Sequence, residues 1–384
     1  MNKAPLHIAL GTTGVLALLY VAFTAFLHKM LNDPSSAAPP YVTPAIAHAR
    51  QTPLPSPFGH DSTAMDVVQG VDLRGKIAVM TGAHSGTGRE TAKALAHAGA
   101  TIIALARDVD RAKESSRDIP SAKVEYVDLL QPDSINAFTT RYVESGRPIH
   151  ILVNSAAIMG TPLERDARGY ERQFATNVLG HLQLTKALLP ALERAHGARV
   201  INVASRGHHA GGIQFDDIHF HRMPYTGMRA YAQSKTALIL LSLQEDKLWR
   251  NKNIRVFSTT PGPVPSSDLF AAGMVGQRSA YQVAMVRHLA AFVRFTQATA
   301  VLNLLRRPAN VGDRYKTVQQ GGATAAWAAT SAMLGGLGGV YIEDSNVAPL
   351  VPEEGRAPHG VKSWAVDETV AERLWTVCEQ MPRT

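Results

Sequence analysis

The chain has 384 residues, 45% of them hydrophobic, and a formal net charge of +8. This length can bury a large core, arranged as one large domain or two ordinary ones. The single cysteine, Cys378, excludes an intrachain disulfide framework and leaves too few thiolates for a zinc site. The 39 Lys and Arg residues form no long block, so the basic excess favours anionic small molecules or lipid head groups over nucleic acid.

Near the N-terminus, residues 8–27 (IALGTTGVLALLYVAFTAFL) carry no charge. A helix of about 20 residues crosses a hydrocarbon core of about 30 Å, so residues 1–31 are expected to form a single membrane anchor. A cleaved signal peptide is the alternative, because AIAHA near Ala47 fits a cleavage site, but such peptides have shorter apolar regions. Lys3 and Lys29 flank the span on both sides and determine its orientation poorly; a cytoplasmic catalytic domain is favoured.

Residues 32–61 are rich in Pro, Ser and Ala, a composition that packs no core and favours extended backbone. They predict a semi-rigid tether leading to one folded domain, residues 62–384. Within that domain, short β-rich runs alternate with helical patterns: KIAVMTG, TIIALAR, KVEYVDL, IHILVNS, RVINVAS, NIRVFST and GGVYIED. This alternation predicts an α/β fold, a doubly wound parallel sheet of the Rossmann type with helices on both faces.

The first of these runs leads directly into TGAHSGTGRE and then into a helical pattern. Gly82, Gly86 and Gly88, with Ser85 and Thr87 between them, allow a tight turn and close approach of backbone to a pyrophosphate. The helix N-terminus behind them offers N–H groups and a positive dipole end. A plain structural turn is the alternative, but the strand before and the helix after favour dinucleotide binding.

The end of the second strand bears on cofactor choice, because an acidic residue there holds the 2′-hydroxyl of NAD. The sequence IIALARD places Arg107 at this point, and a guanidinium suits the 2′-phosphate of NADP. Asp108 is adjacent, so a shift of one residue would reverse the preference; NADP(H) is favoured over NAD(H). At the end of the third strand, Asp128, followed by Leu129, is a candidate for binding adenine, or else an acid near a helix N-cap.

Further along, AYAQSKTAL places Tyr231 and Lys235 one helical turn apart, a spacing that by itself fits any helix. Together with the preceding T-G-x-x-x-G-x-G pattern, it makes the chain from about Ser62 onward resemble the short-chain dehydrogenase/reductase family. The segments SRGHHAGGIQFDDIHF, GGVYIEDSNVAP and AERLWTVCEQM resemble more narrowly the membrane-tethered branch of retinol dehydrogenases and WW-domain oxidoreductase-like enzymes.

The resemblance implies a catalytic tetrad of Asn177, Ser205, Tyr231 and Lys235. Tyr231 would exchange the proton with the substrate oxygen, and the Lys235 ammonium would lower the pKa of its phenol. Ser205 would hydrogen-bond the same oxygen. The resemblance adds that Lys235 binds the nicotinamide ribose and links to a water held by Asn177. Individually, each residue also has an ordinary structural interpretation.

Two further elements of the family are matched. NSAA corresponds to its N-N-A-G element and gives Asn154, with Ala157 in place of the usual glycine. TTPGPVPSSDL corresponds to P-G-x-V-x-T and implies cofactor contacts from the following residues: Pro261, Gly262, Val264 and Ser266. Ser266 replaces the threonine that usually meets the nicotinamide carboxamide, beside an unusual Pro265.

His208 and His209 follow Ser205, but adjacent histidines usually point apart, and no carboxylate or cysteine stands at ligand spacing. We expect them to be loop residues, with no metal site. Residues 267–319 match the variable substrate region of the family. They predict a helical lid over a hydrophobic substrate or a surface that dips into the bilayer; a helix pair completing the core is equally compatible.

These observations predict a membrane-anchored, NADP-dependent oxidoreductase that interconverts a carbonyl and an alcohol, with Tyr231 as acid and base. The expected partners are a lipophilic alcohol, aldehyde or ketone, and membrane lipid through the N-terminal helix. A homodimer is compatible with the sequence, and nucleic acid is not expected. The alternative is a non-catalytic dinucleotide-binding sensor or scaffold tethered to a membrane.

Overall fold

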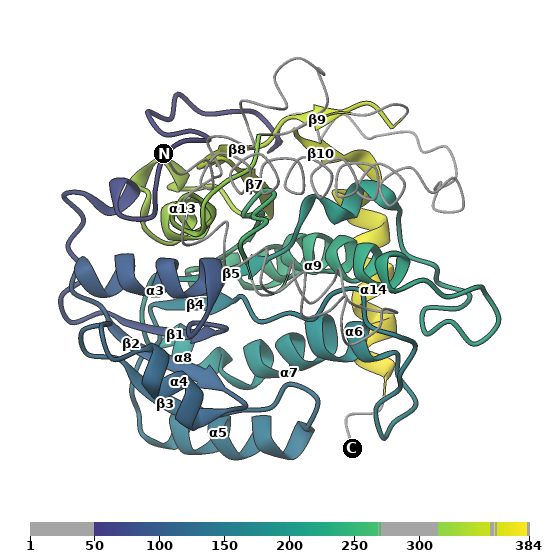
Figure 1. Cartoon of the computed structure of the whole chain (residues 1–384), viewed down its shortest axis with the longest axis horizontal. Coiled ribbons are helices and arrows are strands. Elements are labelled where there is room, and N and C mark those ends of the chain that lie inside the picture. Colours follow the sequence, from purple (N-terminus) through teal and green to yellow (C-terminus); the bar gives the residue numbers. More distant parts are fainter. Residues whose placement is uncertain (1–49, 268, 270–313, 354–356, 358, 382–384) are drawn as a thin grey trace, which may run out of the picture. The chain divides into compact units, whose positions relative to one another are not determined.

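An eight-stranded sheet crosses the part of the chain that the computed structural model describes, residues 50–267, 269, 314–353, 357 and 359–381 (Figure 1). Its strands are β1 (Ile77–Thr81), β2 (Thr101–Ala106), β3 (Lys123–Tyr126), β4 (Ile151–Asn154), β5 (Ala198–Val203), β6 (Ile254–Thr259), β7 (Val340–Glu343) and β8 (Asn346–Val347). The seven strands expected from the sequence are confirmed. Neither β8 nor the small sheet of β9 (Leu350–Val351) and β10 (Val361–Lys362) was expected.

The strand order across the sheet is β3-β2-β1-β4-β5-β6-β7-β8. Strands β1 to β7 pair in parallel, whereas β8 pairs antiparallel with β7 through a two-residue turn. The order reverses between β1 and β4, which is the arrangement of a doubly wound sheet, so the expected Rossmann-type fold is confirmed. Ligands of such sheets bind outside the carboxyl ends of the strands at this reversal.

Helices cover both faces of the sheet (Figure 1). They are α3 (Gly86–His97), α4 (Val109–Ser115), α5 (Pro132–Glu144), α6 (Arg172–Phe174), α7 (Gly180–Ala187), α8 (Leu189–Glu193), α9 (Gly227–Trp249), α13 (Val318–Thr330) and α14 (Glu368–Gln380). Side chains alternate along the strands: Ala78 and Met80 pack with α3 and α13, whereas Val79 packs with α5 and α8. A third cluster joins α14 to α7 and α9.

Helices α3 and α13 pack closely against one another, because two glycines of α13 face α3. A methyl group in place of a Gly321 hydrogen would lie 2.5 Å from Cγ2 of Thr87 and 2.8 Å from Cγ2 of Val264. At Gly322 the same methyl would lie 3.0 Å from the Thr87 carbonyl oxygen. Gly321 is therefore the point where α13 contacts both the helix after β1 and the segment after β6.

The folded part of the chain begins before Ser62, within the segment expected to be a tether. Gln51 is 4% exposed, and its amide completes the edge of β7. Its oxygen accepts from Tyr341 N at 3.0 Å, while Nε2 donates to Tyr341 O at 3.2 Å and to Ala348 O at 2.8 Å. Asn346 bonds both backbone groups of Leu54 at 2.8 Å. Residues 51–54 are thus fastened to β7 and β8.

Replacing Gln51 by Ala should destabilise the protein by about 1–3 kcal/mol, because the Tyr341 N–H and the Ala348 carbonyl lose the Gln51 amide as their partner. Urea unfolding monitored by tryptophan fluorescence measures the difference. The control is Gln69→Ala, at an exposed position, which should change stability by less than about 0.5 kcal/mol. Equal stability of Gln51→Ala and Gln69→Ala would show that this attachment is incidental.

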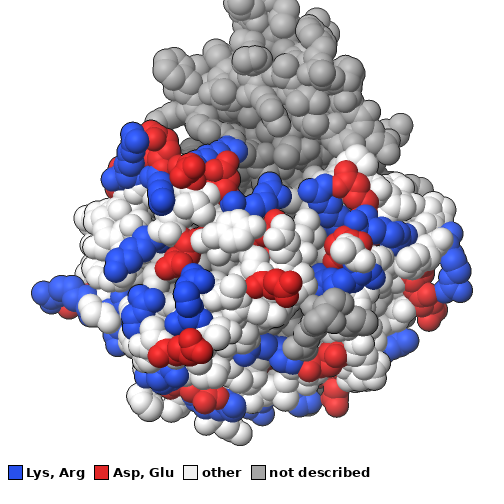
Figure 2. Space-filling view, turned by 90° about the horizontal axis from the view of Figure 1, so that it is seen from below, with Lys and Arg blue, Asp and Glu red and all other residues white. Residues whose placement is uncertain are grey.

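Charged side chains of both signs are interspersed on the face of the molecule shown in Figure 2. Many basic residues have acidic neighbours; Arg89 and Lys93, for example, both pair with Asp118, at 2.5 and 2.6 Å. The expected anchor at residues 8–27 and most of the variable region 267–319 lie outside the described residues. Among the residues that are described, no helix has the length and apolarity needed to cross a membrane.

Candidate active site

The glycine loop after β1 has the shape that a pyrophosphate requires. Gly82 and Gly86 have φ values of +68° and +53°, which side chains rarely adopt. A methyl at Gly82 would lie 2.9 Å from Ala156 N, and one at Gly88 would lie 2.5 Å from Gly82 O. Ser85 caps α3 without a side-chain hydrogen bond, which leaves the helix N-terminus to an anion. The residues present therefore fit a dinucleotide.

Ser205 and Tyr231 meet at the carboxyl edge of the sheet, just after β5. Both side chains lie beside Gly207, where an added methyl group would be 3.1 Å from Tyr231 Cε1 and 3.5 Å from Ser205 Oγ, and Ser205 Oγ accepts from Gly207 N at 3.0 Å. Tyr231 is 5% exposed and lies in the second turn of α9. Burial raises the pKa of the Tyr231 phenol to about 12, an effect that the Ser205 hydroxyl opposes. The phenol is therefore protonated near neutral pH.

Lys235 lies one turn further along α9, behind Tyr231. Its ammonium donates to Val203 O at 2.8 Å and lies 5.5 Å from the centre of the Tyr231 ring. The residue is 2% exposed, and burial lowers the pKa of its amine to about 7. Near neutral pH the lysine therefore lies close to its own midpoint, so small changes in the surrounding charge alter its protonation.

Asn177 lies in a π-helical turn, η3 (Ala175–Leu179), between α6 and α7. Its side chain accepts from Ile158 N at 2.9 Å and donates to Ile158 O at 3.0 Å, so the amide mimics a strand partner. Its Nδ2 also donates to Ser234 Oγ at 3.1 Å, within the turn that separates Tyr231 from Lys235. Isolated π-turns of this kind occur frequently at functional sites. The structure thus brings the four tetrad candidates together.

Residues 260–266, which follow β6 and are named here the post-β6 loop, lie at the same edge. Val264 and Ser266 are both 4% exposed, and Gly262 has a φ of +74°. The loop contacts α13 through Val264 and Gly321. The carboxyl ends of β1, β4, β5 and β6 therefore gather the glycine loop, the tetrad candidates and the post-β6 loop.

Comparisons with known proteins bear on this arrangement. The family model described as short chain dehydrogenase matches residues 76–272. The chain is 31% identical to retinol dehydrogenase 11 of Mus musculus over 313 residues, which covers 80% of this chain and 86% of the relative. The chain belongs to the short-chain dehydrogenase/reductase family. It is an NAD(P)-dependent enzyme of the type that interconverts alcohols and carbonyls.

Within the family, the chain falls in the retinol-dehydrogenase-like branch. It is 30% identical to the WW domain-containing oxidoreductase of Gallus gallus over 361 residues, covering 89% of this chain and 78% of the relative. Among solved structures, the Pseudomonas aeruginosa RhlG/NADP active-site complex superposes with a TM-score of 0.52 at 25% identity, covering 71% of this chain and 95% of that one.

Two of the residues expected to contact the cofactor, Asn154 and Asp128, use their side chains in hydrogen bonds within the protein. Asn154 is 1% exposed, and its amide donates to Thr185 Oγ1 at 2.9 Å and Asn202 Oδ1 at 2.7 Å, inside the domain. Asp128 accepts from Leu130 N at 3.0 Å and organises the turn before α5, beside Leu129, which is 7% exposed. Asn154 remains a cofactor candidate from the family motif, and Asp128 and Leu129 remain candidates from their place at the end of the third strand.

His208 and His209 lie in a short 3-10 helix, η4 (Arg206–Ala210), rather than in an open loop. His208 is fully buried, with Nδ1 2.8 Å from Ser205 O and Nε2 3.3 Å from Lys362 N. His209 Nε2 lies 2.9 Å from Gly360 O. The two rings contact backbone groups that fasten the C-terminal segment to the end of β5.

Sequence reasoning missed two residues that support the site, His181 and Thr81. His181 is 1% exposed, and its Nδ1 lies 2.9 Å from Asn177 O. A carbonyl only accepts, so Nδ1 carries the proton; burial lowers the imidazole pKa to about 4, which keeps the ring neutral. Nε2 therefore accepts from Thr81 Oγ1, at 2.9 Å.

The hydroxyl of Thr81 continues this chain of hydrogen bonds to the next strand. Its oxygen accepts from Ser155 N at 2.9 Å and from Ala156 N at 3.0 Å, just after β4. The chain thus runs from the end of β1 through His181 to the π-turn of Asn177. Its sequence signals are modest: Thr81 directly precedes the first glycine, and His181 lies four residues after Asn177.

Thr81→Val, which keeps the shape but removes the hydroxyl, should lower kcat roughly ten- to a hundredfold, because small displacements of catalytic groups have effects of this size. Thr81→Ser, which retains the hydroxyl, is the control and should stay close to the wild type. Steady-state kinetics measures both.

His181→Phe should give a similar loss, and the Thr81→Val/His181→Phe double variant should lose little more than either single variant, because both changes break one chain. Fully additive losses would contradict a shared chain of hydrogen bonds.

Proposed function

We propose that the protein is an NADP-dependent oxidoreductase that interconverts a carbonyl and an alcohol on a lipophilic substrate, with Tyr231 as the acid and base. The observation that carries this proposal is the close approach of Ser205 and Tyr231, which both lie beside Gly207, with Lys235 buried behind Tyr231. Asn177 braces the same turn of α9 through Ser234. The glycine loop lies at the same edge of the sheet.

In carbonyl reduction, the bound nicotinamide supplies a hydride to the carbonyl carbon. Tyr231 donates its phenolic proton to the carbonyl oxygen, and Ser205 donates a hydrogen bond to that oxygen as charge develops there. A phenol with its pKa raised to about 12 is fully protonated near neutral pH and so begins as the acid. In alcohol oxidation, Tyr231 accepts the proton instead, and the Lys235 ammonium favours the phenolate.

Preference for NADP is supported by the environments of the two charged residues after β2, Arg107 and Asp108. Asp108 is the N-cap of α4, and its Oδ1 accepts from Arg111 N at 3.0 Å. A carboxylate engaged in this way is less suited to hold a ribose hydroxyl. Arg107 is exposed beside it, at the carboxyl end of β2. Its guanidinium can bind a 2′-phosphate in bidentate fashion.

A lipophilic substrate is supported by the similarity to a protein named for retinol, an apolar alcohol. The uncharged run at residues 8–27 supports the same conclusion, because an enzyme anchored at a bilayer meets lipophilic substrates at high local concentration. We propose that this run anchors the protein through one helix, with the catalytic domain on the cytoplasmic side. Anchoring can be tested by carbonate extraction of membranes carrying the full chain.

Tyr231→Phe should lower kcat for reduction of a lipophilic aldehyde such as retinal by roughly 10²–10⁴-fold, because the proton donor is lost. The full-length protein in detergent micelles is assayed by following NADPH oxidation. Tyr142→Phe is the matched control: Tyr142, in α5, is also buried, at 2% exposure, but its hydroxyl donates to Pro148 O after that helix, so the change should leave activity unchanged.

Two outcomes would contradict the proposal in different ways. Tight NADPH binding with no turnover across a panel of lipophilic aldehydes and ketones would favour a non-catalytic sensor. Wild-type activity in Tyr231→Phe would show instead that another group supplies the proton.

Arg107→Ala should raise the KM for NADPH about tenfold, because one charge-assisted bidentate contact is lost, and should leave the KM for NADH nearly unchanged. Asp108→Asn keeps the helix cap, since Asn caps as well as Asp, and should leave both constants close to the wild type. A large rise in the KM for NADH in Asp108→Asn would make Asp108 the residue that selects the cofactor, and NAD the preferred one.

A further inference from the structure

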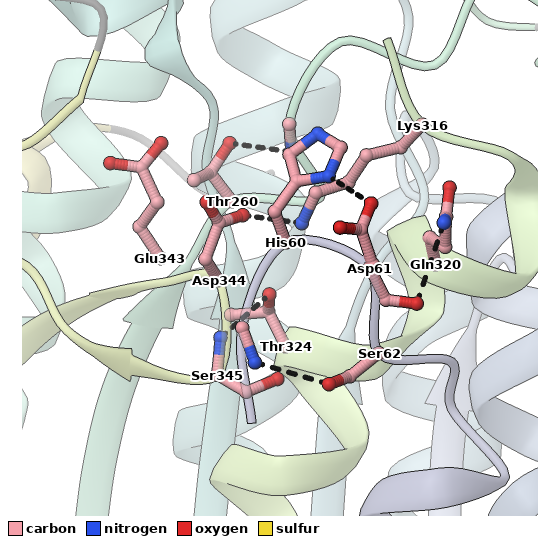
Figure 3. A network of polar contacts seen from close by, with 12 residues as sticks. His60, Asp61, Ser62, Thr260, Lys316, Gln320, Thr324, Glu343, Asp344 and Ser345 are labelled. Atoms are coloured by element: carbon pink, nitrogen blue, oxygen red, sulfur yellow. Dashed lines mark hydrogen bonds and ion pairs between the residues drawn. The ribbon is translucent and has the colours of Figure 1, made fainter. Parts of the chain in front are cut away.

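Lys316 is a buried lysine that none of the family motifs includes. Its side chain is 1% exposed, and its ammonium forms an ion pair with Asp344 in the turn between β7 and β8 (Figure 3). It stands two residues before α13, whose N-cap is Thr317. A buried charge of this kind is retained only where it is paired, so the pair fixes the distance between two segments of the chain.

The rest of Lys316 lies against the post-β6 loop. Its backbone N–H donates to Pro263 O at 2.9 Å. A methyl in place of a Gly262 hydrogen would lie 3.2 Å from Cδ and 3.3 Å from Cε of Lys316, so the aliphatic stem forms the floor beneath Gly262. Both the backbone and the side chain of Lys316 therefore hold this part of the loop.

The other half of the ion pair is held in an unfavourable backbone geometry. Asp344 and Ser345 have φ values of +49° and +56°, in the left-handed region that residues other than glycine seldom occupy. Thr324 of α13 steadies the turn by accepting from Ser345 N at 3.4 Å. In this conformation the Asp344 carboxylate reaches Lys316, as Figure 3 shows. Strained residues of this kind persist where the surrounding structure over-determines them.

Thr260 links the loop to the same strand. Its backbone N–H donates to Ile342 O at 3.0 Å, and its hydroxyl accepts from Gly262 N at 3.2 Å. Gly262 is thus held from the β6 side by Thr260 and from below by Lys316. Gly321 of α13 also packs against Val264. The post-β6 loop is therefore contacted by β7, by the segment before α13 and by α13 itself.

We propose that Lys316 and Asp344 are positioning residues for the nicotinamide end of the cofactor. This inference rests on the proposed function and on the family resemblance, which implies that residues of the post-β6 loop contact the cofactor and that Ser266 meets the nicotinamide carboxamide. Neither side chain touches the reacting atoms. Their ion pair sets the height of the post-β6 loop above β7, and hence the place of the nicotinamide relative to Tyr231.

The test compares two ligands in the full-length protein: NADPH, and 2′,5′-ADP, which lacks the nicotinamide. Lys316→Met keeps the aliphatic stem but removes the charge. It should weaken NADPH binding roughly tenfold and lower kcat, because the post-β6 loop no longer holds the nicotinamide ring in position. Its affinity for 2′,5′-ADP should match the wild type. Asp344→Asn should behave in the same way, and Lys316→Arg, which keeps the charge, should recover part of the loss.

Arg168→Met is the matched control. It removes another buried ion pair, with Asp166, in which the two side chains are 9% and 4% exposed, and it should change neither affinity. Unchanged NADPH binding in Lys316→Met and Asp344→Asn would overturn the inference. An equal loss of both ligands would also overturn it, because the pair would then support the fold in general.

If the wild type prefers NADH, the same comparison is made with NADH and ADP-ribose. The test of Lys316 and Asp344 therefore does not depend on which dinucleotide the protein prefers. A wild type that binds no dinucleotide would overturn the proposed function itself, and with it this inference.

Discussion

Burial of the amine of Lys235 constrains everything else at the site. A charged ammonium in a protein interior is unfavourable unless nearby groups compensate it, and here the amine donates to a single backbone carbonyl, Val203 O, among the contacts described. Its pKa falls to about 7, while that of the Tyr231 phenol rises to about 12. Burial thus shifts both groups toward their neutral forms. A change in local charge will move both pKa values, which is the behaviour expected of an acid–base pair used in catalysis.

Such pKa changes can serve catalysis only if the side chains keep their positions. Two sets of contacts outside the tetrad hold them there. The chain through Thr81 and His181 ties the π-turn of Asn177 to the ends of β1 and β4. The pair of Lys316 and Asp344 supports the post-β6 loop from β7 and α13. The tetrad candidates and the post-β6 loop belong to separate elements. Their spacing therefore depends on these hydrogen bonds and this ion pair rather than on local sequence.

The strands and the glycine loop could be predicted because their signals are local. Apolar runs of strand length, and glycines between a strand and a helix, report on their own conformation. Gln51 could not be predicted in this way: its partners, Tyr341 and Ala348, lie about 290 residues further along the chain. Lys316 likewise gave no signal, because a buried ion pair between distant segments leaves no periodic pattern.

The contacts of Asn154 could not be predicted from the sequence for a different reason. The family motif placed it near the cofactor, but the last residue of a strand points to whichever face the register selects, and β4 directs its amide toward Thr185 and Asn202. For the tetrad candidates, order along the chain was sufficient to group them, and the structure brings them together. Their assignment to catalysis remains a prediction.

The most direct test of the account is the pKa of the Tyr231 phenol, with and without bound NADP⁺. Ultraviolet difference absorbance reports phenolate, and subtracting the signal of Tyr231→Phe isolates this residue from the other tyrosines. We predict a pKa near 12 for the phenol in the free protein and a fall of about 1–3 units with the cationic cofactor bound, because an opposite charge nearby favours the phenolate. An identical titration in the two states would contradict it.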